Sequence, residues 1–253
     1  MRSTFRCASS PIDRFRKHDT HMRALLALAA LLVASGCVSV PGPANPRDPW
    51  ESYNRTVYKF NDAADKAVLK PVAQGYQAVT PNFMQAGVRN FFDNLNDIST
   101  GLNNILQGKV ADGLSDLGRF GFNSVVGIFG LWDVATPLGL EKHDEDFGQT
   151  LGWWGVPSGP FFMIPLLGPS TARDAPARYV DPNFAYYRSI NQVWVRNTLY
   201  GLNIISVRAG LLQTEKLFDD AALDPYSFLR DAWMQRRQNQ VYDGKPPKEK
   251  DDD

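Results

Sequence analysis

Hydrophobic residues recur at helical spacing over most of the chain beyond residue 47. Between residues 51 and 69 they fall every three or four positions, with charged residues on the other faces. Because one face of an α-helix repeats every 3.6 residues, this pattern predicts an amphipathic helix. The hydrophobic face consists of Tyr53, Val57, Phe60, Ala64 and Val68.

Local signals predict where this helix begins and ends. Asp48 stands where an N-cap is expected, Pro49 suits the first helical position, and Glu51 fits a capping box. Pro71 after Lys70 should end the helix, because proline lacks an amide hydrogen and collides with the preceding turn.

The same pattern predicts further helices along the chain. One opens at Thr80-Pro81 and runs up to Gly108, and another covers 110–125. A third extends from about 183 to 212, and a fourth starts at Asp224-Pro225, again an N-cap followed by proline.

Two stretches do not fit ordinary helices. Residues 121–140 are apolar on nearly every side but broken by glycine and proline, and 147–174 have glycine or proline every few residues. We expect a short hairpin or extended loops in 147–174, with "FFMIPLL" exposed or inserted. Gly148, Gly152, Gly155 and Gly159 have the spacing of helix-pairing motifs, but lie outside any 20-residue apolar helix, so we interpret them as loop hinges.

The N-terminal region has the features of an export signal. Arg23 precedes an apolar run over 24–34 that is too short to cross a bilayer, followed by small residues. We interpret 22–36 as a signal peptide and 1–21 as an upstream extension ahead of a true start at Met22. The alternative is a long, disordered basic region before the signal.

Cys37 follows the sequence "ASG", which resembles a bacterial lipobox with Ala34 in the usual leucine position. We therefore predict that Cys37 becomes the acylated N-terminus, with 37–47 as a tether. A buried thiol or half of a disulfide is the alternative, although the following proline-rich segment belongs to no evident core. Val38 in place of aspartate favours, by analogy, export to the outer membrane.

Composition restricts the function of the remaining chain. Six Lys/Arg and two Asp/Glu lie in the first 36 residues, so the mature chain has 217 residues and a net charge of −4. This balance argues against nucleic-acid binding, which needs a basic patch. All six Trp follow Cys37, which indicates a large core or contact with lipid headgroups. We expect one helical domain over 48–243 and a solvated, disordered tail over 244–253.

Motifs for catalysis or cofactor binding are missing from the sequence. It has no G-x-S-x-G elbow, phosphate loop, H-E-x-x-H or cysteine pair. His143 is the single histidine after Cys37 and the one candidate for a metal ligand or base, but "EKHDED" at 141–146 is typical of a solvated loop. Asp219-Asp220 has the pattern of exposed charge. We therefore predict no enzyme activity, no cofactor and no metal.

Amphipathic helices leave two environments open. Such helices can pack on one another as a soluble core, or lie in a membrane with the apolar face about 5–10 Å into the acyl boundary. Periodicity does not separate these alternatives, and on pattern alone a soluble core is favoured.

Four longer segments resemble the MlaA/VacJ family of outer-membrane lipoproteins. They occur in the same order and with similar spacing and extend over nearly the whole mature chain. They are "DPWESYNRTVYKFN" at 48–61, "RFGFNSVVGIFGLWDVA" at 119–135, "FGQTLGWWGVPSGPFFMIPLLGPSTARD" at 147–174 and "DPYSFLRDAWMQRR" at 224–237.

The resemblance implies a fold and a function. The fold is an all-α ring of amphipathic helices around a central channel, with a short Gly/Pro-rich hairpin or loop insertion, lying in the inner leaflet of the outer membrane. Phospholipids that are mislocalised in the outer leaflet pass through this channel to a soluble periplasmic carrier, without covalent chemistry. The ring also binds trimeric porins. A scaffold for porins that moves no lipid, or a lipid hydrolase using His143, are the alternatives.

The resemblance also suggests residues for the channel or its gating. These are Phe60, Asn61, Gly148, Gly152, Gly155, Gly159 and Pro160. Phe60 also belongs to the hydrophobic face of its helix, so the alternative is a core phenylalanine beside a neutral surface amide. Trp153-Trp154 and Pro157-Ser158 depart from the family pattern in this glycine loop.

We predict that Cys37→Ala yields an unlipidated protein that is retained in the inner membrane or periplasm, because no other cysteine follows the apolar run over 24–34. Fractionation of membranes on a density gradient measures this. Wild-type levels of the variant in the outer-membrane fraction would show that anchoring does not depend on Cys37.

Overall fold

The computed structural model describes residues 45–181, 189–221 and 223–247, and this part of the chain is mostly helical with one two-stranded hairpin. The strands β1 (Phe161–Ile164) and β2 (Gly168–Thr171) are antiparallel. The helices are α2 (Glu51–Ala64), α3 (Lys70–Val79), α4 (Asn82–Leu106), α5 (Val110–Val125), α6 (Phe147–Trp153), α7 (Asp174–Val180), α9 (Val193–Ala221) and α10 (Pro225–Val241).

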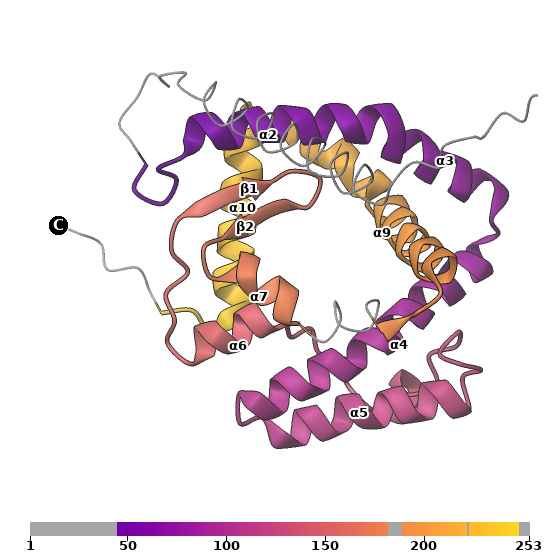
Figure 1. The fold of residues 1–253 in the computed structure, drawn as a ribbon. Coiled ribbons are helices and arrows are strands. Elements are labelled where there is room, and N and C mark those ends of the chain that lie inside the picture. Colours follow the sequence, from indigo (N-terminus) through magenta and orange to yellow (C-terminus); the bar gives the residue numbers. More distant parts are fainter. Residues whose placement is uncertain (1–44, 182–188, 222, 248–253) are drawn as a thin grey trace, which may run out of the picture.

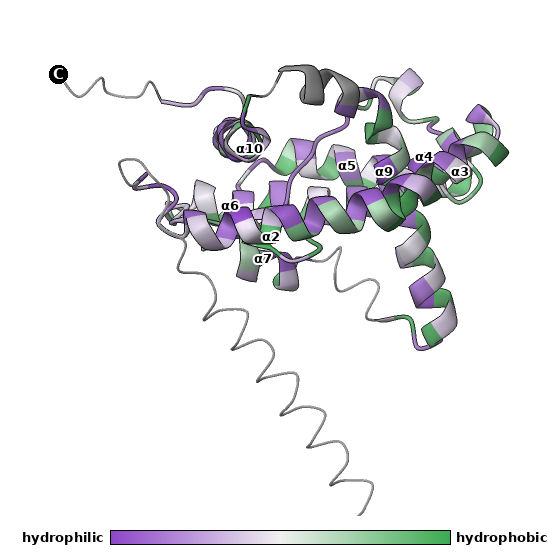
Figure 2. Ribbon diagram, turned by 90° about the horizontal axis from the view of Figure 1, so that it is seen from above, coloured by the Kyte–Doolittle hydropathy of each residue, from purple (hydrophilic) through white to green (hydrophobic). Residues whose placement is uncertain are grey.

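The elements follow a closed circuit in Figure 1. Helices α2 and α3 form one edge, α9 packs beside α3, and α4 pairs with α5 on the opposite side. The hairpin, α6, α7 and α10 complete the circuit. From above, hydrophobic residues recur along α3, α4, α5 and α9, whereas α10 is largely hydrophilic (Figure 2).

Burial along α4 is the reverse of that in a soluble helix. Asn94, Asp97 and Asn104 are at most 3 % exposed, while Leu102 and Leu106 are more than 40 % exposed. Across the described residues the buried side chains are mostly polar, and a small hydrophobic cluster forms only around the hairpin. The burial along α4 therefore contradicts the conventional soluble core that periodicity alone favoured. Within the described ranges, no helix has the length and hydrophobicity needed to cross a bilayer.

The start of α2 differs from the prediction. The helix begins at Glu51 with Trp50 at the cap position and no side-chain cap. Asp48 lies before it, buried, and accepts hydrogen bonds from Asn54, Tyr226 and Arg230. The carboxylate of Asp48 therefore joins α2 to α10 and does not cap α2, and the three buried donors would lack a partner without it.

Pro71 does not end the first helix, contrary to expectation. A π-helical turn, Asp65–Leu69, leads directly into α3, with Pro71 in its first turn. The chain stays helical through this proline, and the amide of Lys70 bonds to the carbonyl oxygen of Asp65 with the wider spacing of a π turn, a local widening of the kind that accompanies proline within helices. The predicted hydrophobic face also divides, since Val57 is buried whereas Phe60 and Val68 are more than half exposed.

The hairpin prediction is confirmed, but the expectation that no helix forms in 147–174 is wrong. Helix α6 begins at Phe147, capped by the side chain of Asp146, which accepts from the amide of Gln149. Within "FFMIPLL", Phe161 and Met163 are buried in the hydrophobic cluster, while the turn at Leu166 is exposed.

The C-terminal helices follow the predicted signals with shifted limits. Helix α9 begins at Val193 and continues to Ala221, past the expected end at 212, and the expected start near 183 lies outside the described residues. Asp224 caps α10 through the amide of Tyr226, as predicted. Of the predicted tail, 244–247 are described and 248–253 are not.

Helices α4 and α5 approach each other through glycines. A methyl group added at Gly113 would lie 2.7 Å from the carbonyl oxygen of Gly101 and 2.6 Å from Cγ1 of Ile105. Such distances are far inside van der Waals contact, so the two backbones pack closely because both positions lack a side chain.

We predict that Gly113→Ala destabilises the α4–α5 pair by about 1–3 kcal/mol, the usual cost of overpacking. Gly118→Ala on the same helix is the matched control, because no atom lies within 4 Å of its added methyl group. There the higher helix propensity of alanine should stabilise by about 0.5–1 kcal/mol. Thermal unfolding of both variants in detergent measures the difference, and equal midpoints would contradict the close-contact interpretation.

Candidate functional site

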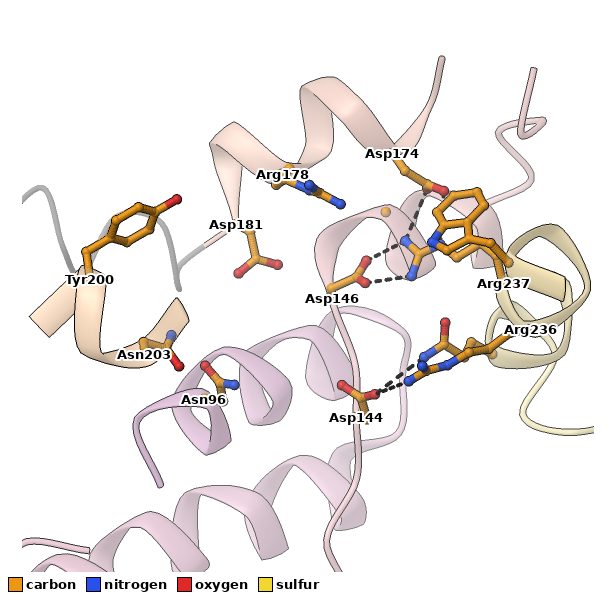
Figure 3. A pocket seen from close by; sticks show the side chains of 13 residues that line it. Asn96, Asp144, Asp146, Asp174, Arg178, Asp181, Tyr200, Asn203, Arg236 and Arg237 are labelled. Carbon is orange, nitrogen blue, oxygen red and sulfur yellow. Dashed lines mark hydrogen bonds and ion pairs between the residues drawn. The ribbon is translucent and has the colours of Figure 1, made fainter. Parts of the chain in front are cut away.

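A polar cavity of about 430 Å³ lies between α4, α6, α7, α9 and α10, and Figure 3 shows it from close by. Each of these helices contributes at least one lining residue, so the cavity lies inside the circuit of elements. The lining consists of Asn96, Asp144, Asp146, Gly148, Asp174, Arg178, Asp181, Tyr200, Asn203, Trp233, Arg236, Arg237 and Gln240.

Arg237 of α10 makes the strongest ionic contacts in this cavity. Its Nη1 and Nη2 donate to Asp146 at 2.6 Å each, and its Nε donates to Asp174 at 2.9 Å. Burial alone would raise the pKa of both carboxyl groups, but hydrogen bonds from Arg237, joined at Asp174 by Arg173, hold these pKa values below the usual range. Arg237 and Asp174 are both at most 10 % exposed, so removing one of these two costs roughly 3–5 kcal/mol, whereas Asp146 is 41 % exposed and its pair contributes less.

Gly148 and Gly152 of α6 make room for these arginines. A methyl group at Gly148 would lie 2.4 Å from Nη2 of Arg237, and one at Gly152 would lie 2.6 Å from Nη1 of Arg173. The interpretation of these two glycines as loop hinges is therefore wrong, since both lie within a helix at sites of close packing.

Other charges in the cavity are weakly held. Arg236 and Asp144 are 73 % and 79 % exposed, and their closest nitrogen and oxygen are 3.8 Å apart. Gln240 reaches Asp144 at 3.4 Å. Arg178 of α7 is exposed, donates to the carbonyl oxygen of Leu167, and makes no ion pair with any described residue. Exposed pairs of this kind contribute at most about 1 kcal/mol.

Asn61 contacts the turn of the hairpin. Its Nδ2 donates to the carbonyl oxygen of Ile164 at 3.0 Å, and its Oδ1 accepts from the amide of Leu166 at 2.7 Å. Asn54, two helical turns earlier, bonds in the same way to Phe161 and Met163 of β1. These two amides satisfy backbone groups along an edge strand that would otherwise need another partner.

The structure does not bring all predicted site residues together. Phe60 is 54 % exposed, so the interpretation of Phe60 as core is wrong, and Asn61 is not a neutral surface amide. Gly155 and Gly159 have positive φ angles of 89° and 68°, in the connection between α6 and β1, with Pro160 directly after them. Only Gly148 of the predicted set lines the cavity described above.

A second polar cluster lies between α4 and α5. Buried Arg119 contacts Asp97, Asp133 and the carbonyl oxygen of Leu140. Burial raises the pKa of Asp97 to about 6, although the charge of Arg119 opposes this shift. His143 bonds through Nδ1 to Asp116 at 2.9 Å. Among the described residues, no group of three His, Cys, Asp or Glu side chains has a metal-binding arrangement.

Sequence analysis missed the charged residues of the cavity. Asp146 belongs to a loop interpreted as solvated, and Arg237 to a polar helix end, so neither stood out. Both lie inside segments that resemble the family or directly beside them, which is the one signal in the sequence that points to them.

The chain is similar to known proteins over most of its length. A family model described as MlaA lipoprotein matches residues 46–240. The intermembrane phospholipid transport system lipoprotein MlaA of Escherichia coli is 33 % identical over 218 residues, covering 83 % of this chain and 85 % of that protein. The lipoprotein of the same name from Haemophilus influenzae is 30 % identical, with 90 % and 93 % covered.

A solved structure shares the fold. It was reported under the heading "Structural basis for maintenance of bacterial outer membrane lipid asymmetry" and superposes with a TM-score of 0.67 at 31 % identity, covering 77 % of this chain and 98 % of the other. Together with the family match over 46–240, this likeness shows that the chain belongs to the MlaA lipoprotein family.

Proposed function

We propose that this protein removes mislocalised phospholipids from the outer leaflet of the outer membrane. The lipids move through a channel inside the ring of helices and pass to a periplasmic phospholipid carrier, which maintains lipid asymmetry. The names of the relatives from Escherichia coli and Haemophilus influenzae describe phospholipid transport and support this proposal.

The observation on which the proposal rests is the reversed polarity of the fold. Polar side chains line the cavity inside the circuit, and large hydrophobic side chains such as Trp194 and Val207 of α9 are exposed. A phospholipid headgroup needs a polar route through hydrocarbon because desolvating a charged group is costly. A polar interior within an apolar exterior provides such a route.

The proposal includes a location and partners. Acylation of Cys37 would anchor the protein in the periplasmic leaflet of the outer membrane, where exposed hydrophobic helices contact acyl chains. A trimeric outer-membrane porin is the proposed neighbour within the membrane, and the periplasmic carrier receives the lipid. Binding and translocation of lipid require no covalent step, no cofactor and no metal.

Two other functions make different demands on the structure. A scaffold for porins would not need the charged cavity. A lipid hydrolase would need a base, and His143 is held against Asp116 in the α4–α5 cluster, whose residues do not line the cavity. The cavity therefore favours lipid transport over both alternatives.

We predict that Asn96→Trp impairs transport, because Asn96 lines the cavity and an indole ring there obstructs the route through it. In a strain without the wild-type protein, this variant should increase the outer-leaflet phosphatidylethanolamine that a membrane-impermeant amine reagent labels. Leu102→Trp, on the exposed face of the same helix, is the control and should restore wild-type labelling.

A scaffold that moves no lipid gives a different result in this experiment. Both tryptophan variants would then behave like wild type while still co-purifying with a porin. Equal labelling in the two variants, at normal protein levels, would contradict the transport proposal.

We also propose that the turn of the hairpin gates the channel. Its position is set by two parts of the chain: Phe60 and Asn61 on α2, and the connection that contains Gly155, Gly159 and Pro160. Gly148 and Gly152 act through α6, which they allow to approach α10. The two hydrogen bonds between Asn61 and the turn, one donated by its Nδ2 and one accepted by its Oδ1, support this role.

We predict that Asn61→Ala leaves the protein folded but releases the turn, so that lipid flux and outer-membrane permeability to a hydrophobic dye change. Asn90→Ala is the control, because Asn90 donates one comparable bond to a loop carbonyl, that of Leu131, away from the hairpin. A purely structural role would instead lower the amount of protein and give the defect of a deletion strain, without a change in permeability beside a wild-type copy.

A further inference from the structure

We infer that the cavity recognises a zwitterionic phosphoamine headgroup through a replaceable ion pair, Arg236 with Asp144, assisted by Arg178. The inference rests on the proposed transport function and identifies the headgroup chemistry that this chain prefers. Phosphatidylethanolamine has this chemistry, in which a phosphate anion is joined to a primary ammonium.

Apart from Asp181, which is buried and accepts hydrogen bonds from Ser99 and the amide of Phe147, the charges that line the cavity fall into two groups. Arg237 is buried and makes four hydrogen bonds with Asp146 and Asp174, so a passing ligand cannot displace those carboxylates without exposing a buried charge. Arg236 and Asp144 are mostly exposed and 3.8 Å apart. Figure 3 shows Arg236 extending toward Asp144, apart from the group around Arg237.

Replacement of this pair conserves charge. Before binding, Arg236 and Asp144 neutralise each other across a long contact. A phosphoamine headgroup can insert between them, with its phosphate on the guanidinium and its ammonium on the carboxylate, so that one weak pair becomes two. A phosphoglycerol headgroup offers the phosphate alone and would leave Asp144 without its cation.

Arg178 supplies a second guanidinium from the α7 side of the cavity. It is exposed, faces the cavity in Figure 3, and has no carboxylate partner in the described part of the chain. Arginine suits phosphate because its planar guanidinium donates two parallel hydrogen bonds to phosphate oxygens. The replaceable charges are therefore two cations and one anion, which match a phosphate next to an ammonium.

The test measures lipid bound to the purified, full-length protein. The protein is equilibrated in detergent with equal amounts of phosphatidylethanolamine and phosphatidylglycerol, and bound lipid is counted by native mass spectrometry. Asn96→Trp, in which an indole ring obstructs the cavity, gives the reference for lipids on the outer surface. Only lipid in excess of this reference is assigned to the cavity.

Two substitutions should shift the bound ratio in opposite directions. Asp144→Asn removes the partner of the ammonium, so the ratio of phosphatidylethanolamine to phosphatidylglycerol should fall about two- to fivefold, as expected for an exposed charge pair. Arg236→Gln removes a cation, which disfavours the anionic lipid more, so the ratio should rise. Asp62→Asn, at a partly exposed aspartate paired with Lys66, and Arg89→Gln, at an exposed arginine, both lie outside this cavity; they are the controls and should leave the ratio unchanged.

The outcomes separate this inference from the proposed function. If lipid binds in the cavity but the ratio of phosphatidylethanolamine to phosphatidylglycerol is the same in Asp144→Asn, Arg236→Gln and wild type, the inference is wrong and the transport proposal is unaffected. If the wild-type protein binds no more lipid than Asn96→Trp, the transport proposal itself is contradicted. Glycerophosphoethanolamine, the same headgroup without acyl chains, is added in a separate arm. Displacement of lipid by millimolar amounts would show that the site takes the soluble headgroup, and lack of competition supports a lipid ligand.

Discussion

The buried contacts of Arg237 with Asp146 and Asp174 hold the interior of this protein together. One guanidinium from α10 joins the residue that caps α6 to the first residue of α7. Arg237 and Asp174 are both at most 10 % exposed, so neither charge is stable there without the other, whereas Asp146 is 41 % exposed. The same contact requires glycine at position 148, because any side chain there would occupy the position of the Arg237 guanidinium.

This ionic centre explains why the fold can do without a large hydrophobic core. The hydrophobic cluster around Val57, Phe161, Met163 and Tyr226 is small, and elsewhere in the described residues polar contacts join the elements. Asn54 and Asn61 attach the hairpin to α2, and Arg119 joins α5 to the loop that follows it. Because many large hydrophobic side chains of the described residues are exposed, the elements are joined mainly by hydrogen bonds and ion pairs between buried or half-buried groups.

The sequence predicted most helices but few of their contacts. Periodicity and the Asp224-Pro225 signal located α4, α5 and α10, because helix spacing and caps are local properties. The prediction that Pro71 ends the first helix was wrong because the sequence does not reveal the π turn before it, and without that turn the proline is read as a helix end. Asp48 and Gly148 misled for a different reason, since each is explained by partners more than 80 residues away in the chain.

The burial of Asp48 has a mechanical consequence for membrane attachment. Three donors from α2 and α10 fix this residue to the body. An acyl group on Cys37 would be joined to that fixed point by eleven residue steps, which span at most about 40 Å when fully extended. An acyl anchor on Cys37 would therefore hold the protein at the corner where α2 and α10 meet, and the body would tilt against the bilayer about that corner.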